Sequence, residues 1–469
     1  MVDAPGSVPA ELAESRRPPP ASELSRRFLV ALGGVALGAV LLRVVYIAVI
    51  GPHLQPGADT TFYMLAGQIL SSTHHYDDPA SFFAGRRVPT ANFPPLYPML
   101  IAALDRVGVK TFTALEVVGA LCGGVTVALT GALALGVTRR HGVALLAAAL
   151  VAVSPALVAA DASVMAESIG VPLAVGTLLA AVWAVRRGGV VRWVLPGALA
   201  GLCALARSEA VLLGVVLVPA VALVAPRPGW RSRLGAAAVA VFATAVLLAP
   251  WIARNETVFH PGITFSTNEA KTLAGANCGP VYGGPLIGLW DFDCLDQARR
   301  SGLGQGRLTQ VLNAQGAQEI RDHLGRVPAV VGVRVLRAWG LYDPIQQARW
   351  EAVESRDVGW GDLVWPSSIV LLVLAVPGVA RVRRDRLALL ILVGPPVLAT
   401  VTVAFTYGNQ RFVLDAVPVL CIAAAVSLVH WGDVLVARRS RDDGAETSGP
   451  GRQRGEEGTV ADGVIAEGR

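Results

Sequence analysis

A set of charged residues lies close to the ends of long apolar segments of the chain. The set comprises Asp59, Asp161, Glu167, Glu209, Arg207, Arg254 and Arg411. A carboxylate can take a proton from a hydroxyl group, and an arginine can hold a phosphate through two parallel hydrogen bonds. Transporters place ionisable groups near the middle of the bilayer, often at broken helices. Charged groups gathered at one membrane surface therefore favour chemistry on a substrate in the outer leaflet.

The composition is that of a membrane protein. Of the 469 residues, 53% are apolar and 16% are charged, whereas a soluble chain carries about a quarter of charged residues. The net charge is +6, and Lys110 and Lys271 are the only lysines. The basic excess is arginine in short loops, which fits membrane orientation and argues against nucleic-acid binding. The five cysteines and seven histidines have no zinc-type spacing.

Long apolar runs predict an all-α polytopic protein with about ten transmembrane helices. The predicted spans cover residues 28–50, 112–137, 142–160, 169–185, 194–206, 209–225, 234–251, 365–380, 388–405 and 412–430. Arg26 and Arg27 precede the first span, and no small-residue cleavage pattern follows it, so we expect a retained anchor. With the N-terminus in the cytoplasm, every dense arginine cluster falls on the cytoplasmic side. The C-terminus is then cytoplasmic as well.

Two segments are ambiguous. Residues 94–108 are apolar but short, and a span there would place later arginine clusters outside. We expect this segment to be a helix lying on the outer surface of the membrane. Residues 194–225 turn at Arg207, and a single crossing would again reverse the later loops, so a hairpin is predicted.

This topology divides the chain into five parts. The predicted parts are a disordered tail (1–27), an N-terminal transmembrane module (28–251) with a first external loop (51–111), a large external loop (252–364), C-terminal transmembrane helices (365–431) and a second disordered tail (432–469).

Two motifs in the first external loop carry a resemblance to a known family. They are Ala58-Asp59-Thr60-Thr61-Phe62-Tyr63 and Asn92-Phe93-Pro94-Pro95-Leu96-Tyr97-Pro98. The chain resembles the GT-C fold glycosyltransferases that use polyprenyl-phosphate sugars. It is most similar to the protein O-mannosyltransferase and aminoarabinose-transferase group, glycosyltransferase family 39 in the broad sense. In that family an external acidic residue is followed by an aromatic residue, and a Pro-Pro-Leu-Tyr-Pro-like element opens a juxtamembrane helix.

Further elements follow in the order of the family, from about residue 28 to 430. They are Ser163 to Glu167, the hairpin Gly201 to Glu209, Pro250 to Asn255, and Gln410-Arg411-Phe412 followed by Pro418. There are two departures. Thr60 stands where many relatives have a second acidic residue, and Phe412 stands where tyrosine is usual. The first departure leaves one carboxylate at this point, which puts a metal site there in doubt.

The resemblance implies inverting transfer of a monosaccharide from a polyprenyl phosphate to an acceptor on the external face of the cytoplasmic membrane. It implies Asp59 as the general base and Arg254 and Arg411 as ligands of the donor phosphate. Substrate-binding or supporting roles are expected for Glu167, Asp161, Tyr63, Tyr97 and Asn255. No metal ligand is assigned and no cofactor is certain, although a divalent metal near His74 and His75 is left open.

Each residue also has a purely structural interpretation. Asp59 could be a solvated loop carboxylate, and Glu167 could pair with a neighbouring arginine. Arg254 and Arg411 could anchor helix ends by reaching the lipid headgroups. Arg43 lies inside the first predicted span, where an unpaired charge is costly. It could pair with Glu116 or meet the lipid phosphate, and of the two the structural pairing is expected.

Cys278 and Cys294 both fall in the large external loop, where the environment is oxidising, so a disulfide between them is predicted. The segment from Ser266 to Trp290 is rich in glycine, asparagine and aromatic residues. Tyr282, Trp290 and Asn277 could contact a sugar, or the segment could simply wrap around the disulfide.

Two rival functions remain open at this stage. One is a lipid-linked sugar flippase or another transporter, and the other is a non-catalytic scaffold for assembly of the cell envelope. The depth of the charged residues favours the enzyme. The sequence leaves the donor sugar open, and the acceptor could be a protein, a lipid or a polysaccharide.

Overall fold

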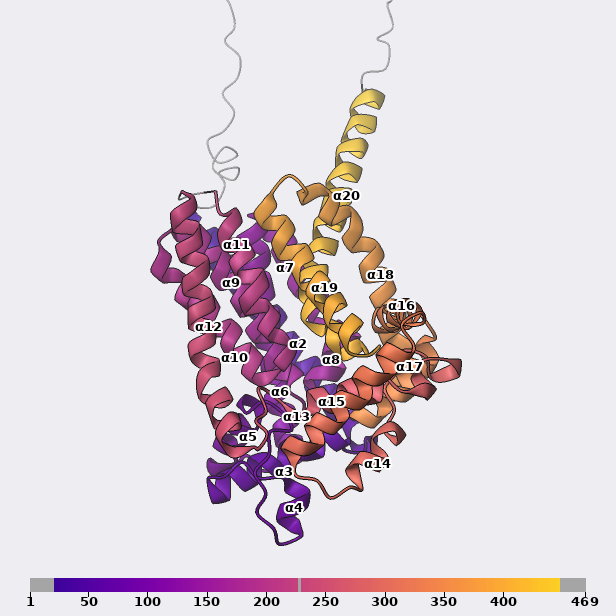
Figure 1. The fold of residues 1–469 in the computed structure, drawn as a ribbon. Helices are drawn as coiled ribbons and strands as arrows, with labels where there is room; N and C mark the ends of the chain where they lie inside the picture. Colours follow the sequence, from indigo (N-terminus) through magenta and orange to yellow (C-terminus); the bar gives the residue numbers. More distant parts are fainter. Residues whose placement is uncertain (1–20, 227–228, 448–469) are drawn as a thin grey trace, which may run out of the picture. The chain divides into compact units, whose positions relative to one another are not determined.

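The computed structural model describes residues 21–226 and 229–447 and consists of helices joined by loops (Figure 1). Among these residues the only extended pairing is an isolated bridge between Asp77 and Pro89. The chain forms two compact units, residues 1–427 and 428–469. The site described below lies within the first unit.

Seven helical stretches of the described residues are long and apolar enough to cross a membrane. They are Ser25–His53, Phe112–Thr138, Glu167–Arg187, Trp230–Val258, Val358–Val382, Arg386–Phe405 and Gln410–Arg439. The pair α7 (His141–Ala152) and α8 (Pro155–Asp161), bent by 59°, would make an eighth crossing. The predicted all-α polytopic membrane fold is confirmed. The predicted count of about ten is reached only if the shorter apolar helices Val190–Ala206 and Ser208–Val224 cross as well.

The helices of the N-terminal half are α2 (Ala21–Val49), α3 (Ala58–Thr73), α4 (Pro79–Phe83), α5 (Leu96–Arg106), α6 (Phe112–Thr138), α9 (Glu167–Arg187), α10 (Val194–Ala206), α11 (Val218–Val224) and α12 (Trp230–Val258). The later helices are α13 (Thr267–Ala276), α14 (Asp296–Arg299), α15 (Gln305–Asp322), α16 (Val327–Ala338), α17 (Pro344–Glu351), α18 (Val358–Val382), α19 (Arg386–Phe405) and α20 (Val417–Thr447).

Small residues let the membrane helices approach closely. A Cβ atom at Gly119 on α6 would collide with the backbone carbonyl of Asp161 at the end of α8. A Cβ atom at Gly197 on α10 would collide with the backbone of Ala240 on α12. Helices in lipid associate through such close packing because lipid chains are as apolar as the helices. The packing around Gly119 also fixes the end of α8 beside the site.

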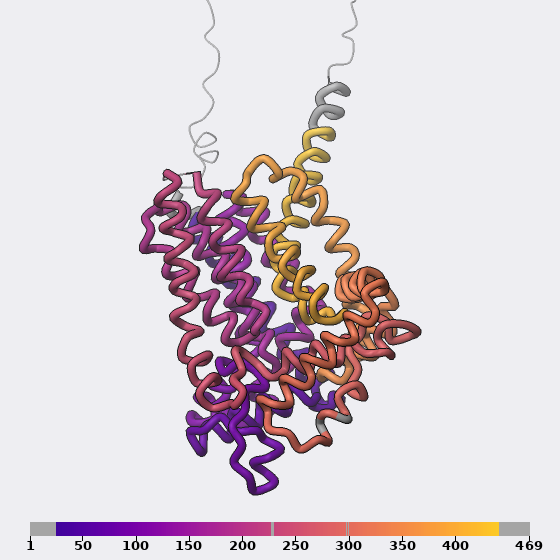
Figure 2. The backbone as a smooth tube through the Cα atoms, viewed as in Figure 1, coloured from indigo at the N-terminus to yellow at the C-terminus, as the bar shows by residue number. Residues whose placement is uncertain are grey.

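The two large loops predicted to be external lie at the same end of the bundle. Figure 1 shows α3, α4 and α5 of the first loop close to α13, α14 and α15 of the second, and Figure 2 shows the same meeting of indigo and orange segments. The Thr267 backbone N–H donates to the Ala91 carbonyl over 2.9 Å, and the Ser266 hydroxyl donates to the Asn92 carbonyl over 2.6 Å. These bonds join the loops directly.

The apolar segment 94–108 forms α5, a helix of 11 residues. This helix packs against α3, with Tyr97 and Ile101 buried. It is too short to span a bilayer at about 1.5 Å per residue. A short helix is therefore observed where one was predicted, and its location on the outer surface of the membrane stays a prediction.

The predicted tails differ in extent from the observed helices. Residues 1–20 and 448–469 of those tails lie outside the described residues. Helix α2 begins at Ala21 and α20 continues to Thr447, so residues 21–27 and 432–447 are helical.

Candidate active site

Asp59 lies in the first turn of α3, where the helix dipole favours a negative charge. Gly57, the N-cap residue of α3, has no room for a side chain, because a Cβ atom there would collide with the Val353 carbonyl. The Gly57 backbone N–H donates to the Ser355 hydroxyl over 2.6 Å. The start of α3 is therefore fixed against the segment that precedes α18.

Arg411 gathers three carboxylates from distant parts of the chain. It lies in the 3₁₀ helix Gln410–Ala416, which the Asn409 side chain caps by accepting from the Arg411 backbone N–H. Its guanidinium lies 3.0 Å from Asp59 Oδ2, 2.8 Å from Glu167 Oε1 and 3.2 Å from Glu354 Oε1. The Glu167 side chain is 1% exposed, so its contact with Arg411 is almost completely shielded from solvent. Sequence reasoning proposed pairing with an arginine for Glu167, and the structure supplies that partner.

A second buried arginine, Arg207, extends this network. Its Nη2 lies 2.6 Å from Glu209 Oε1, and its Nη1 lies 3.9 Å from Glu167 Oε1. Arg207 also donates to the Arg411 carbonyl over 3.1 Å. Glu167 is thus placed between two arginines, and the predicted hairpin tip is connected directly to the Arg411 cluster.

Several oxygen atoms of this network have no hydrogen-bond partner within the described structure. They are Glu167 Oε2, Glu354 Oε2 and Asp415 Oδ1. Buried polar atoms are nearly always paired, so such atoms are suited to contact a ligand or water. Burial raises the pKa of Glu354, and the nearby Arg411 acts in the opposite direction.

Two cavities meet at Arg411. The helix-end cavity has a volume of about 590 Å³ and is lined by Tyr63, Arg207, Glu209, Leu212, Glu269, Val401, Phe405 and others. The loop cavity has a volume of about 600 Å³ and is lined by Asp59, Phe62, Lys271, Trp290, Phe292, Arg349, Trp350, Glu354 and others. Arg411, Tyr407, Asn268 and Thr272 line both cavities. Two substrates bound in these cavities would therefore meet at the arginine.

An aromatic cluster supports the wall of the helix-end cavity. The Tyr63 ring stacks on Phe93 at a centroid distance of 4.6 Å and meets the Tyr97 ring edge-on at 5.1 Å. Tyr63 and Phe93 line the helix-end cavity, whereas Tyr97 is buried behind them. The motifs Asp59 to Tyr63 and Asn92 to Pro98 thus meet in space, with Tyr97 as a supporting residue.

Arg254 and Asn255 lie apart from both cavities. Arg254 donates to the carbonyls of Thr90 and Tyr76 and lies over the Trp251 ring at 5.1 Å. Asn255 is fully buried and donates to the Phe265 carbonyl over 3.1 Å. Arg254 therefore ties the large external loop to the first loop, whereas Asn255 holds a turn within the large loop. A phosphate contact for Arg254 stays a prediction, since neither cavity is lined by it.

Asp161 pairs with Arg43, and this corrects the expected pairing of Arg43 with Glu116. Arg43 Nε lies 2.7 Å from Asp161 Oδ2, and the two side chains are 0% and 2% exposed. Arg43 also donates to the carbonyls of Ala39 and Ala152. The bend between α7 and α8 brings Asp161 to the arginine, a displacement that apolar periodicity does not reveal. Asp161 lines neither cavity, so a substrate-binding role for it stays a prediction.

Three site residues were not identified from the sequence. Glu354 and Arg356 come just before α18, and Glu269 lies in the first turn of α13. Arg356 lies 2.8 Å from Glu351, and Glu354 contacts Arg411. The closely spaced charges of residues 351–357 before an apolar span were the available signal.

The arrangement of these carboxylates does not fit a metal. Within residues 21–226 and 229–447, no group of three or more His, Cys, Asp or Glu side chains is placed to hold one. The guanidinium of Arg411 itself lies among Asp59, Glu167 and Glu354. His74 and His75 are exposed at the end of α3.

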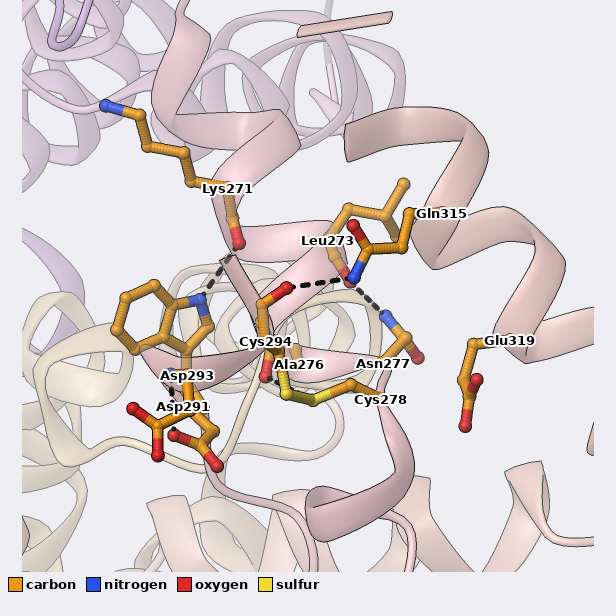
Figure 3. The surroundings of a disulfide bond; sticks show 12 residues. Lys271, Leu273, Ala276, Asn277, Cys278, Asp291, Asp293, Cys294, Gln315 and Glu319 are labelled. Atoms are coloured by element: carbon orange, nitrogen blue, oxygen red, sulfur yellow. Dashed lines mark hydrogen bonds between the residues drawn. A yellow bond between two sulfur atoms is a disulfide. The ribbon is translucent and has the colours of Figure 1, made fainter. Parts of the chain in front are cut away.

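The predicted disulfide between Cys278 and Cys294 is confirmed in the structure (Figure 3). The Gln315 side chain donates to the Cys294 carbonyl over 2.9 Å and attaches the loop to α15. The three residues considered for sugar contact, Tyr282, Trp290 and Asn277, lie in different surroundings. Trp290 lines the loop cavity, whereas the Tyr282 hydroxyl donates to Asn277 Oδ1 inside the folded loop.

Part of the chain matches the model of a known protein family. Residues 92–253 match the model of the dolichyl-phosphate-mannose-protein mannosyltransferase family. The matched range contains the Pro-Pro-Leu-Tyr-Pro element, Glu167 and the hairpin at Arg207. No curated protein matches the sequence.

Solved structures show the fold. The apo oligosaccharyltransferase of Archaeoglobus fulgidus matches with a TM-score of 0.52 and 17% identity, over 89% of this chain and 52% of that protein. The same protein in complex with Zn and sulfate matches with a TM-score of 0.50 and 16% identity, over 86% and 50% of the two chains. ArnT from Cupriavidus metallidurans bound to undecaprenyl phosphate matches with a TM-score of 0.40 and 15% identity, over 87% and 78%.

The chain spans about half the length of the oligosaccharyltransferase that it matches. It is a multi-pass membrane protein with a GT-C-type fold, and the resemblance predicted from its sequence is confirmed. The family model and the solved structures both belong to membrane glycosyltransferases of the GT-C type.

Proposed function

We propose that this chain is a membrane glycosyltransferase that moves a monosaccharide from a polyprenyl phosphate to an acceptor on the external face. The observation that carries the proposal is the position of Arg411. This residue lines both cavities and is paired with Asp59, one of the two carboxylates of the loop cavity. One arginine at the meeting point of two cavities can hold the phosphate of a donor close to the base that activates an acceptor.

The helix-end cavity is the proposed site of the donor. Leu212, Val401 and Phe405 lie along its wall at the ends of apolar helices, and Phe405 is 77% exposed. Such a wall suits a lipid that enters from the bilayer, because apolar chains bind apolar surface. The same cavity offers Arg411 to the phosphate. Arginine suits this role because its planar fork gives two parallel hydrogen bonds to phosphate oxygens.

The loop cavity is the proposed site of the acceptor. Asp59 takes the proton from an acceptor hydroxyl, whose oxygen then attacks the anomeric carbon of the donor sugar. The bond between that carbon and the phosphate oxygen breaks, and the polyprenyl phosphate leaves with the bonding electron pair. Attack from the side opposite the leaving group inverts the configuration. Arg411 stabilises the charge that develops on the phosphate.

Donor binding would also change the surroundings of Asp59. In the structure, Arg411 Nη1 lies 3.0 Å from Asp59 Oδ2 and 3.2 Å from Glu354 Oε1. A phosphate that reaches this guanidinium competes with both carboxylates for its N–H groups. Asp59 Oδ2 then becomes available to accept the proton of the acceptor hydroxyl. The base is thus released when the donor is in place.

The test is mass spectrometry of polyprenyl-phosphate sugars and envelope glycans. A strain lacking the protein is compared with the same strain restored by wild type or by Asp59→Asn at equal protein level. We expect only wild type to restore a missing glycan, while the lipid-linked sugar accumulates in the Asp59→Asn strain. Equal restoration by both would show that Asp59 is not the base and would favour transport. The sugar that is missing from the strain lacking the protein identifies the donor sugar.

A further inference from the structure

The loop cavity contains cationic and aromatic side chains that the transfer reaction does not use. Lys271 on α13 and Arg349 on α17 line it, together with Trp290, Phe292 and Trp350. Asp59 lines the same cavity. Whatever accepts the sugar must therefore present its hydroxyl to Asp59 beside these residues.

Three cationic side chains, Lys271, Arg349 and Arg411, line the loop cavity together with two carboxylates. Its two carboxylates, Asp59 and Glu354, are both paired with Arg411. Arg349 is exposed and makes no ion pair with any carboxylate in the part of the chain that the structure describes. Lys271 donates to Asn92 Oδ1. The cavity therefore offers a guanidinium to an anionic group on the ligand.

The aromatic wall is fixed in place. The Trp290 indole N–H donates to the Lys271 carbonyl over 3.0 Å, and the Phe292 ring meets the indole edge-on at 4.3 Å. Both residues lie between Cys278 and Cys294, so the disulfide closes the segment that carries them. A rigid, half-buried indole presents a broad apolar surface at low entropic cost, and such a surface suits the C–H-bearing face of a sugar ring.

We propose that the acceptor is an anionic glycan, with a sugar ring on Trp290 and a carboxylate or phosphate group held by Arg349. This inference rests on the proposed function, since it assigns the acceptor to the cavity of Asp59. Arginine recognises carboxylate and phosphate through the same pair of hydrogen bonds, so the chemistry that the two groups share is what the cavity selects.

The experiment measures binding of small sugars to the purified full-length protein in detergent, without turnover. The probes are methyl glucuronide, methyl glucoside, glucose 6-phosphate and a neutral serine-containing peptide. Each is titrated by saturation-transfer NMR against wild type, Arg349→Ala and Trp290→Ala. Arg307→Ala is the matched control, because Arg307 is an exposed arginine of α15 that lines neither cavity. The elution volume in size-exclusion chromatography and the melting temperature verify that each variant is folded. If Trp290→Ala does not fold, Trp290→Phe is used in its place.

We expect the charged sugars to bind about 10-fold more tightly than methyl glucoside, which corresponds to about 1.4 kcal/mol. Arg349→Ala should abolish this preference without changing the binding of methyl glucoside. The loss of the tryptophan should weaken all three sugars, and Arg307→Ala should change none. The arm that binds more tightly, glucuronide or sugar phosphate, identifies the anionic group.

Equal binding of neutral and charged sugars, or an unchanged preference in Arg349→Ala, would overturn the proposal. Preferential binding of the peptide would overturn it as well and would indicate a protein acceptor. The binding assay measures no transfer, so its outcome is independent of the cellular test of Asp59→Asn. If anionic sugars bind but Asp59→Asn is fully active in cells, the proposed base is rejected and the proposed class of acceptor is kept. The two proposals therefore fail separately.

Discussion

Asp59 and Arg411 are 352 positions apart in the sequence, yet their side chains form an ion pair of 3.0 Å. The same guanidinium contacts Glu167 and Glu354, which belong to two further segments. The pair therefore closes the site by joining α3, α9, the segment before α18 and the 3₁₀ helix that begins at Gln410. Catalysis and stability should depend on it in different ways.

Replacement of Asp59 by Asn should abolish transfer while the protein remains folded. Asparagine keeps the shape of the side chain and cannot take a proton, and general-base catalysis contributes roughly 10²–10⁴-fold in rate. The measurement is the rate of transfer in membranes containing equal amounts of wild type and Asp59→Asn. Asp105→Asn is a suitable control, since Asp105 lies on the surface helix α5 and lines neither cavity. A decrease of less than about 10-fold for Asp59→Asn would argue against the general base.

Replacement of Arg411 by Ala should destabilise the protein. Three carboxylates lose their shared partner, and removal of one member of a buried ion pair costs about 3–5 kcal/mol. The measurement is the melting temperature and the yield of folded protein in detergent. Arg411→Lys should recover much of the stability but not the transfer rate, because a lysine keeps the charge and loses the planar fork. Full activity of Arg411→Lys would contradict bidentate phosphate recognition.

Stability should decrease with rising pH through Glu269. This side chain lines the helix-end cavity, where the surrounding protein limits its hydration and raises its pKa from 4.5 to about 7. A hydrogen bond from Ser208 opposes this effect, and the charge of Glu209 adds to it. Between pH 4.5 and about pH 7, the Glu269 side chain is protonated more often in the folded chain than in the unfolded chain. Its contribution to stability is therefore fully present below pH 4.5 and is lost as the pH rises through about 7.

The test compares the melting temperatures of wild type and Glu269→Gln in detergent between pH 5 and pH 8. Glutamine cannot ionise, so the variant should lose this part of the pH dependence while the part due to other groups remains. The difference between the two proteins should grow toward high pH, with the variant the more stable. Parallel curves over the whole range would show that Glu269 does not titrate in this window.

Loss of the disulfide should loosen the large external loop. Replacement of Cys278 and Cys294 by Ala removes a cross-link over 16 positions, which corresponds to about 3 kcal/mol in the chain-entropy model. We expect faster cleavage of the loop in limited proteolysis and weaker sugar binding at Trp290. Cys122→Ala serves as the comparison, because that cysteine is free and lies on α6. Thiol labelling of intact cells should find Cys278 and Cys294 unreactive until a reductant is added.

The buried pair of Arg43 and Asp161 should reveal its structural role through a double variant. Asp161→Leu alone leaves an uncompensated arginine inside the helix bundle and should cost about 3–5 kcal/mol. The combination with Arg43→Met replaces both charges by apolar side chains and should restore most of the loss. Melting temperatures of the two single variants and the double variant provide the cycle. Equal destabilisation of all three would show that the pair does more than compensate its own charges.

Much of the fold follows from the chain itself. Apolar runs of about 20 residues cannot remain in water, and backbone groups in lipid must pair within a helix, so length and composition alone predict membrane helices. Short runs such as 94–108 are limited by the same length criterion. The hairpin near Arg207 and the bend of α7 and α8 are harder, because their helices are shorter than a bilayer or broken.

Several charged residues that meet in the structure were predicted from the sequence by type and position, but their partners were not. Asp59, Glu167 and Arg411 were chosen because they lie at helix ends in family motifs, and the structure brings all three together. Arg254 has the same sequence signals and lies elsewhere, holding two backbone carbonyls. Glu269 lies in the first turn of α13 and Glu354 just before α18, and apolar periodicity does not indicate that either side chain faces a cavity.

The sequence by itself determined that this chain is a helical membrane protein and which two cysteines pair. These features follow from local chemistry and from the length of apolar segments. The tertiary structure alone decided which carboxylates share Arg411, that Asp161 belongs to Arg43, and that two cavities meet at one guanidinium. Such choices depend on helix bends and loop contacts between segments hundreds of residues apart, and no local pattern encodes those distances.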